Sequence, residues 1–146
     1  MAKEKVTTVD PVEEVNNLVS KALVALDKFK EIECQEKIDK IVHAAAVAAL
    51  DQHGPLAIAA FEETGRGLVE DKAIKNLFAC EYITNNLRGL KTVGIVDKDE
   101  SDGLTTIAEP VGVVCGIVPT TNPTSTTVFK SLICLKTRNP IIFSFH

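Results

Sequence analysis

Two continuous apolar runs, separated by a stretch with helical spacing, constrain the fold of this 146-residue chain more than any other feature. The first run covers residues 111–118 and the second covers residues 140–143. Neither run alternates with polar residues, which is typical of strands in a parallel sheet with both faces covered. Between them, Val128, Leu132 and Leu135 recur at helical spacing. The sequence therefore predicts an α/β fold with a parallel βαβ unit over residues 111–146.

Residues 1–91 have a helical pattern instead. Asp10 followed by Pro11 and Glu13 is a good helix start, with an N-cap acceptor, a proline in the first turn and an acid near it. We expect four helices within residues 12–86, the second ending at the His53-Gly54-Pro55 sequence.

The fourth of these helices, over residues 69–86, is predicted to bury one apolar side. That side carries Ile74, Leu77, Phe78 and Tyr82. Phe78 is expected in the core, as are two phenylalanines elsewhere on apolar faces, Phe61 and Phe129.

A β-hairpin is predicted between the helical segment and the βαβ unit, within residues 92–110. Its strands are residues 92–96 and 104–108, and the polar residues 97–103 form the turn. Two parallel strands by themselves would leave open apolar edges, so the chain is expected to be the truncated front part of a larger fold.

Charge and composition exclude several kinds of partner. The net charge is −4, with a pI near 5.4, one Tyr and no Trp, so we expect no nucleic-acid binding. The uncharged residues 110–129 are interrupted by Pro119, Asn122 and Pro123, which predicts a turn and not a membrane span. The N-terminus has no apolar export signal, so a cytoplasmic protein is expected.

No metal site is predicted from the histidines and cysteines. His43 and His53 are ten residues apart, which does not direct both side chains to one ion. In a chain without an export signal, reduced thiols are expected at the four cysteines, Cys34, Cys80, Cys115 and Cys134. Cys115 lies inside an apolar run and is expected to be a buried, unreactive core residue.

The turn at residues 119–123 is the candidate ligand site. It follows a buried strand and precedes a helix, the position at which parallel sheets bind ligands. Its hydroxyl and amide groups, and the free N–H groups of the helix start, suit a phosphate or a ribose. The G-x-G-x-x-G fingerprint is absent, and an ordinary strand–turn–helix connection accounts for the pattern equally well.

Several motifs in the same order resemble one enzyme family. They are the run EPVGVVCGIVPTTNPTST at 109–126, the segments 62–67, 70–76 and 81–83, and Lys136-Thr137-Arg138-Asn139 with the residues before it. They resemble the N-terminal, acylating aldehyde dehydrogenase part of the bifunctional acetaldehyde-CoA/alcohol dehydrogenases, and the similarity runs from about Pro11 to the last residue. The resemblance implies the first part of an NAD-binding domain with a Rossmann-like sheet, in which residues 92–110 are an oligomerisation arm.

The same resemblance implies an activity. An enzyme of this family oxidises acetaldehyde to acetyl-CoA reversibly, with NAD as cofactor and CoA as co-substrate, through a cysteine thiolate. The matching motif assigns NAD binding to Ile117, Val118, Pro119, Thr120, Thr121 and Asn122, and Asn122 is also the candidate oxyanion donor. The nucleophilic cysteine, and the iron of the alcohol dehydrogenase half, are expected outside this chain, so residues 1–146 alone are expected to be inactive.

A second hypothesis needs no catalysis. The chain would then be a helical module whose hairpin mediates subunit assembly through self-association. NAD binding at the 117–122 turn, or its absence, discriminates between the two hypotheses. The length of the acyl chain and the size of the assembly remain open at this point.

Overall fold

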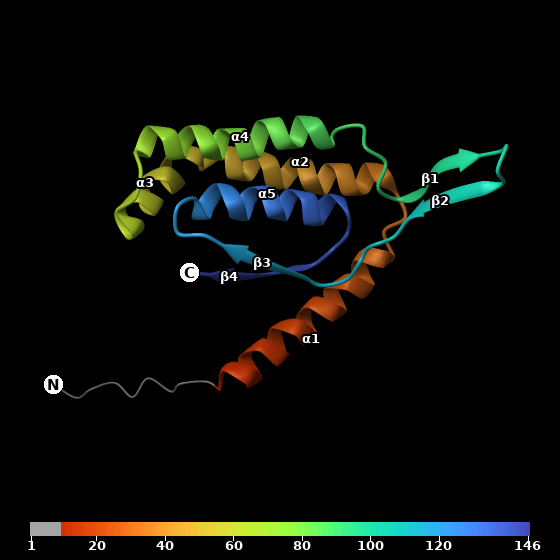
Figure 1. Ribbon diagram of the computed structural model, residues 1–146, viewed down its shortest axis with the longest axis horizontal. Coiled ribbons are helices and arrows are strands. Elements are labelled where there is room, and N and C mark those ends of the chain that lie inside the picture. The colour runs from red at the N-terminus through yellow and green to blue at the C-terminus, as the bar shows by residue number, and fades with distance from the viewer. Residues whose placement is uncertain (1–9) are drawn as a thin grey trace.

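A computed structural model describes residues 10–146 of the protein (Figure 1). The extreme N-terminus, where no export signal is predicted, lies outside the described residues. The elements follow in the order α1 (Pro11–Lys30), α2 (Gln35–Asp51), α3 (His53–Thr64), α4 (Val69–Leu87), β1 (Gly94–Asp99), β2 (Leu104–Ala108), β3 (Val114–Val118), α5 (Pro123–Lys136) and β4 (Ile141–Phe145).

The start of α1 confirms the prediction. Asp10 Oδ1 accepts a hydrogen bond from Val12 N at 3.2 Å, and Pro11 lies in the first turn. The predicted end of the second helix is wrong, because α2 ends at Asp51 and Gly54 belongs to the first turn of α3. Pro55 is tolerated there since the first turn of a helix leaves its N–H groups unpaired.

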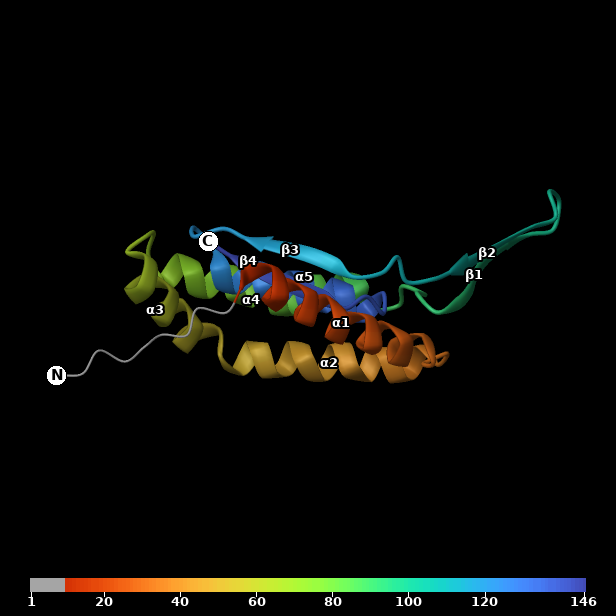
Figure 2. The same cartoon turned by 90° about the horizontal axis from the view of Figure 1, so that it is seen from below.

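The predicted hairpin is present and projects from the body of the molecule (Figures 1 and 2). β1 pairs antiparallel with β2, with a bulge between Ile95 and Asp97. The first strand runs on to Asp99, beyond its predicted end at residue 96. The Asp99 carboxylate closes the turn by accepting hydrogen bonds from Ser101 Oγ at 2.6 Å and Ser101 N at 2.9 Å. The hydrogen bond from the Ser101 side chain, followed by those from backbone N–H groups, lowers the pKa of Asp99.

The predicted βαβ unit is also present. β3 and β4 pair in parallel, Val114 opposite Ile141 and Val118 opposite Phe145, and α5 connects them. A side chain at Gly116 would meet Ile141 Cδ1 at 2.7 Å, so the close approach of β4 requires glycine there. β3 begins at Val114 and not at residue 111, because Gly112 adopts φ 127° and its N–H is bound by Asn139 Oδ1 at 3.1 Å.

One face of the parallel sheet is open, which corrects the expectation that β3 is buried on both faces. Ile117 is 69% exposed, and Cys115 is exposed as well, not buried. Among the described residues α5 lies between the sheet and the helices α2 and α4 (Figure 2), while α1 contacts β4 directly. The side chains of β3 that alternate away from α5 therefore reach the surface.

The core lies where α2 packs against α4 and α5, which run side by side in Figure 1. Its buried cluster consists of Ile38, Val42, Ala46, Val93 and Leu132. The small side chain of Ala46 in this cluster leaves room for the neighbouring helices to pack closely.

The aromatic residues expected in the core are not buried there. Phe61 is 38% exposed and Phe78 is 53% exposed, while Phe129 is half-buried. Phe78 stacks on Tyr82, with ring centroids 5.1 Å apart. α4 buries Lys72 and Asn76 together with Ala79 and Cys80 instead of its predicted apolar side.

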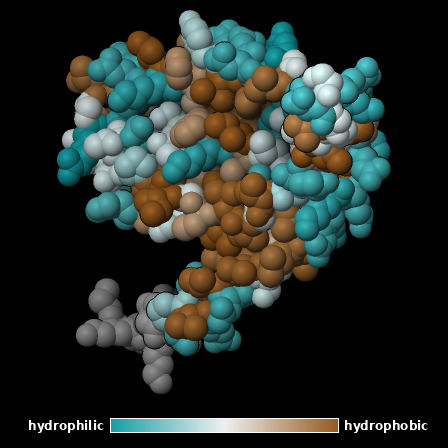
Figure 3. Space-filling model, turned by 45° about the vertical axis from the view of Figure 1, so that its right-hand side comes forward, coloured by the Kyte–Doolittle hydropathy of each residue, from teal (hydrophilic) through white to brown (hydrophobic). Residues whose placement is uncertain are grey.

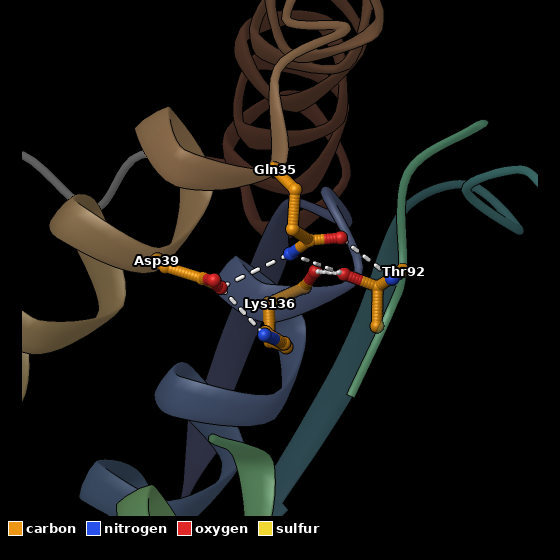
Figure 4. Close-up of polar contacts among 4 residues, drawn as sticks. All are labelled: Gln35, Asp39, Thr92 and Lys136. Carbon is orange, nitrogen blue, oxygen red and sulfur yellow. Dashed lines mark hydrogen bonds and ion pairs between the residues drawn. The ribbon is translucent and has the colours of Figure 1, made fainter. Parts of the chain in front are cut away.

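A partly buried polar cluster fixes the base of the hairpin (Figure 4). Lys136 is 1% exposed and forms an ion pair with Asp39. Gln35 Nε2 donates to the same Asp39 oxygen at 3.0 Å, and Gln35 Oε1 accepts from Thr92 N at 2.8 Å. Thr92 Oγ1 donates to the carbonyl of Lys136 at 2.6 Å, which joins α2, the start of the hairpin and the end of α5.

The next buried cation continues this junction. Arg138 is 3% exposed and adopts a left-handed conformation with φ 58°. Its guanidinium donates to the carbonyl of Ala108 at 3.0 Å and to that of Ile32 at 3.3 Å. The Lys136–Asn139 motif therefore attaches the hairpin and the α1–α2 connection to the βαβ unit.

Hydrophobic surface gathers on the lower part of the molecule in Figure 3, where Figure 1 has α1 and the parallel sheet. α1 buries only Ala22 and Leu26, and Val12 and Val15 on the same helix are more than half exposed. None of the helices within residues 10–146 combines the length and the apolar character that crossing a membrane requires.

Candidate functional site

The predicted ligand turn lies between the end of β3 at Val118 and the start of α5 at Pro123. Asn122 is the N-cap residue of α5, and its side chain makes no capping hydrogen bond. Its Oδ1 instead accepts a hydrogen bond from Thr121 Oγ1 at 2.8 Å. The cap position therefore presents an amide nitrogen that no backbone group of α5 engages.

Two buried polar residues of α4 hold this turn. Lys72 is 4% exposed, and its Nζ donates to the carbonyl of Thr121 at 3.0 Å. Asn76 is 1% exposed; its Oδ1 accepts from Thr124 Oγ1 at 2.7 Å, and its Nδ2 donates to the carbonyl of His53 at 2.9 Å. α4 thus fixes both the turn and the first residues of α5.

Sequence reasoning missed both residues. Lys72 and Asn76 stand four residues apart, so they share a helix face with Ala79 and Cys80. Polar residues at that spacing are usually interpreted as a solvated face. Both residues belong to the 70–76 segment, which resembles the enzyme family. This resemblance was the only sign of their importance, and it assigns no role to either residue.

A groove of about 540 Å³ opens on one side of the turn, between α4 and the start of α5. Its lining is largely apolar, and its polar groups come from Lys75 of α4 and from Asn122 and its neighbours at the start of α5. The lining residues are Ile74, Lys75, Phe78, Ala79, Ile83, Asn122, Ser125, Thr126 and Phe129. The side of α4 predicted to be core is thus one wall of an open groove.

A second, smaller hollow of about 100 Å³ lies on the other side of the turn. It is found at the carboxyl ends of both parallel strands, next to the end of α3. Its lining residues are Glu63, Thr64, Val118, Pro119, Thr120, Pro123, Phe145 and His146. The turn therefore separates an apolar groove from a hollow at the strand ends, the usual ligand position in a parallel sheet.

The predicted site residues divide between these two spaces. Val118, Pro119 and Thr120 line the hollow, and Asn122 lines the groove. Thr121 lies between them with its carbonyl held by α4. Ile117 lines neither space; its side chain is on the open face of the sheet, and its carbonyl accepts from Lys130 Nζ at 2.6 Å.

None of the four cysteines lines the groove or the hollow. Burial raises the pKa of Cys80 and of Cys134, which keeps both thiols protonated. Cys34 Sγ donates to Glu36 Oε2 at 2.8 Å, and this hydrogen bond lowers the pKa of Glu36. Residues 10–146 also contain no cluster of three or more His, Cys, Asp or Glu side chains that could hold a metal ion.

Together, a parallel βαβ unit and a small hollow at the carboxyl ends of its strands define an α/β protein with the layout of an open parallel sheet. Residues 4–144 match the sequence model of the Aldehyde dehydrogenase family, and the chain belongs to this family. The family resemblance of the sequence motifs is thereby confirmed.

One curated relative is similar to this chain along its whole length. Aldehyde-alcohol dehydrogenase 2 of Entamoeba histolytica is 62% identical over 147 residues, which cover 100% of this chain and 17% of that protein. The chain thus spans about a sixth of the length of this relative.

Solved structures agree in fold. An acetylating aldehyde dehydrogenase from Geobacillus thermoglucosidasius superposes with a TM-score of 0.90 at 49% identity, over 92% of this chain and 30% of that one. A Rhodopseudomonas palustris propionaldehyde dehydrogenase, solved with bound CoA and an acylated cysteine, gives a TM-score of 0.74 at 32% identity. The match covers 90% of this chain and 29% of that one. The aldehyde-dehydrogenase-like fold is therefore confirmed.

Proposed function

We propose that this chain lines part of the NAD site and part of the adjoining aldehyde groove of an acylating aldehyde dehydrogenase. The whole protein would be a bifunctional aldehyde–alcohol dehydrogenase of fermentative metabolism. It would convert an aldehyde, CoA and NAD reversibly into an acyl-CoA, NADH and a proton. The observation that carries the proposal is the 118–123 turn, with the strand-end hollow on one side and the apolar groove on the other.

The turn beside the hollow offers groups that suit part of a dinucleotide. Thr120 and Thr121 supply hydroxyl groups suited to ribose or phosphate oxygens, and the Lys72 ammonium provides a positive charge directly behind the turn. NAD, when bound, accepts the hydride that the aldehyde carbon loses. The chain's own contribution is to bind and orient the cofactor with Val118, Pro119, Thr120, Thr121 and Asn122. Ile117 belongs to β3 and contributes through its backbone, next to the residues of the turn.

The groove fits the apolar part of an aldehyde. Phe78, Ala79 and Phe129 provide apolar contacts, and Asn122 lies at the polar end. We assign to the Asn122 amide the stabilisation of the alkoxide that forms when a thiolate attacks the aldehyde carbon, since a positioned donor lowers the energy of developing charge. The attacking thiolate belongs to a residue outside those described. CoA, the co-substrate, then takes up the acyl group as a thioester.

The groove assignment predicts a change of substrate preference in Phe129→Ala. Removing the ring lengthens the apolar groove, and each additional buried methylene contributes about 0.8 kcal/mol. In the full gene product, the ratio of kcat/KM for hexanal to that for acetaldehyde should rise by about tenfold. The formation of NADH with CoA present measures both constants.

Phe61→Ala is the matched control for this experiment. Phe61 is another phenylalanine on a helix, 38% exposed, but it does not line the groove. Its replacement should leave the substrate ratio unchanged. Equal changes for both aldehydes in Phe129→Ala would mean that the groove does not hold the acyl chain.

The hairpin supports a second proposal, that the protein self-associates through residues 92–110. No other helix or strand of residues 10–146 packs against β1 or β2, and Leu104 and Ile107 are 62% and 57% exposed. A projecting hairpin with exposed apolar side chains is suited to pairing with a second subunit.

This proposal predicts that Leu104→Lys with Ile107→Lys reduces the assembly to smaller species. Two charges in an apolar contact remain without partners, which costs several kcal/mol per contact. Sedimentation velocity of the full gene product measures the effect. Ile58→Lys, at a 48% exposed position of α3, should leave the assembly intact. Assembly through the hairpin without any NAD binding would favour the non-catalytic module instead.

A further inference from the structure

Within residues 10–146, Lys72 is a buried cation without a carboxylate partner. Its side chain is 4% exposed, and its one hydrogen bond goes to the neutral carbonyl of Thr121. Lys136, the other buried lysine, is paired with Asp39, and this is the only ion pair that residues 10–146 form. A buried ammonium that is not neutralised by the protein favours an anion nearby, because its charge is weakly screened.

The position of this charge relates it to the 118–123 turn. Lys72 Nζ reaches the turn from α4 and donates to the Thr121 carbonyl at 3.0 Å. Gly67 lies against the lysine stem: a Cβ there would stand 3.7 Å from Lys72 Cε. The side chain is thus packed next to Gly67 and is almost fully shielded from solvent.

We propose that Lys72 is a positioning residue for the dinucleotide, acting through the turn that it holds. It does so in two ways: it directs the Thr121 carbonyl away from the ligand, and it places a fixed positive charge behind the turn, which favours the pyrophosphate. The inference rests on the proposed NAD site and adds a residue that does not touch the ligand. Asn76, which holds Thr124 from the next turn of α4, supports the same segment by neutral hydrogen bonds only.

Three substitutions in the full gene product separate the charge from the hydrogen bond. Lys72→Gln keeps a donor for the Thr121 carbonyl but removes the charge, Lys72→Met removes both, and Lys72→Arg keeps both. Titration calorimetry with NAD, ADP-ribose and adenosine measures the affinities. We expect Lys72→Gln to lower the affinity for NAD and for ADP-ribose by about tenfold, equivalent to about 1.4 kcal/mol. Lys72→Met should lower both affinities further. The affinities of Lys72→Arg should be closer to those of the unsubstituted protein than the affinities of the other two variants.

The affinity for adenosine shows whether Lys72 acts through its charge or only supports the fold. It carries no phosphate, so its affinity should be the same in Lys72→Gln and in the unsubstituted protein. Lys40→Met removes a charge from the exposed face of α2 and should change none of the three affinities. If Lys72→Met is unfolded at the assay temperature, the comparison of Lys72→Gln with Lys72→Arg decides the question.

The outcomes are distinct for the two proposals. NAD affinity in Lys72→Gln within twofold of the unsubstituted protein, or equal losses for NAD and adenosine, would overturn the role of Lys72 alone. If the unsubstituted protein binds neither NAD nor ADP-ribose, the proposed function fails, and the role of Lys72 fails with it.

Discussion

Replacing Thr120 and Thr121 together by phenylalanine should abolish NAD binding by the full gene product. Thr120 lines a hollow of only about 100 Å³, which a phenyl ring occupies. At position 121 the hydroxyl that bonds Asn122 Oδ1 is lost as well. We expect the dissociation constant to rise by at least about 100-fold, or about 2.7 kcal/mol. Titration calorimetry, or quenching of NADH fluorescence, measures the change.

Two adjacent threonines elsewhere in the chain provide the control. Thr105 and Thr106 lie on β2 of the projecting hairpin, where both are exposed. Their joint replacement by phenylalanine adds the same two rings and should leave NAD affinity unchanged. An intact NAD affinity in the Thr120/Thr121 variant would show that the dinucleotide binds elsewhere, and the assignment of the 117–122 segment would be withdrawn.

The βαβ unit could be predicted because its pattern is local. Continuous apolar runs of the right length, with a helix-forming stretch between them, leave few alternatives to a parallel pair. The observed register, Val114 opposite Ile141, agrees with this prediction. The exact start of β3 was not predictable, since it depends on the contact between Gly112 and Asn139, which are 27 residues apart.

The face of α4 could not be predicted from periodicity alone. A stripe of Ile74, Phe78 and Tyr82 predicts a buried side, because apolar area gains free energy on burial. In the structure, Lys72 and Asn76 are buried instead, since the turn before α5 offers acceptors that satisfy them. Such disagreement between local pattern and tertiary structure is typical of functional sites. Here it coincides with the groove.

The exposure of Cys115 has a different cause. An apolar strand predicts cover on both faces, but the sequence of the strand does not say which elements provide it. Among residues 10–146, α5 covers one face of β3, and Cys115 points to the other. The expectation of a buried thiol was therefore wrong, although the parallel strand that it was based on is present.

Residues 1–146 alone should not oxidise acetaldehyde. The reaction requires an activated thiolate, a bound nicotinamide and an oxyanion donor that converge on one carbon. The chain supplies Asn122 and the turn, but none of its cysteines lines the groove or the hollow. Cys80 and Cys134 are buried with raised pKa values. With NAD, CoA and acetaldehyde added to the purified segment, NADH absorbance should rise no faster than in the buffer.

Cys115 provides the most direct test of the prediction that the segment is inactive. It is the most accessible of the four in the structure, and it stands three residues before the end of β3. Solvent exposure by itself does not activate a thiol, because the attacking species is the thiolate and a neighbouring cation or base must favour it. The comparison is therefore the segment against its Cys115→Ala variant. A rate above background that disappears in the variant would place the nucleophile on β3 and make the role of the chain catalytic.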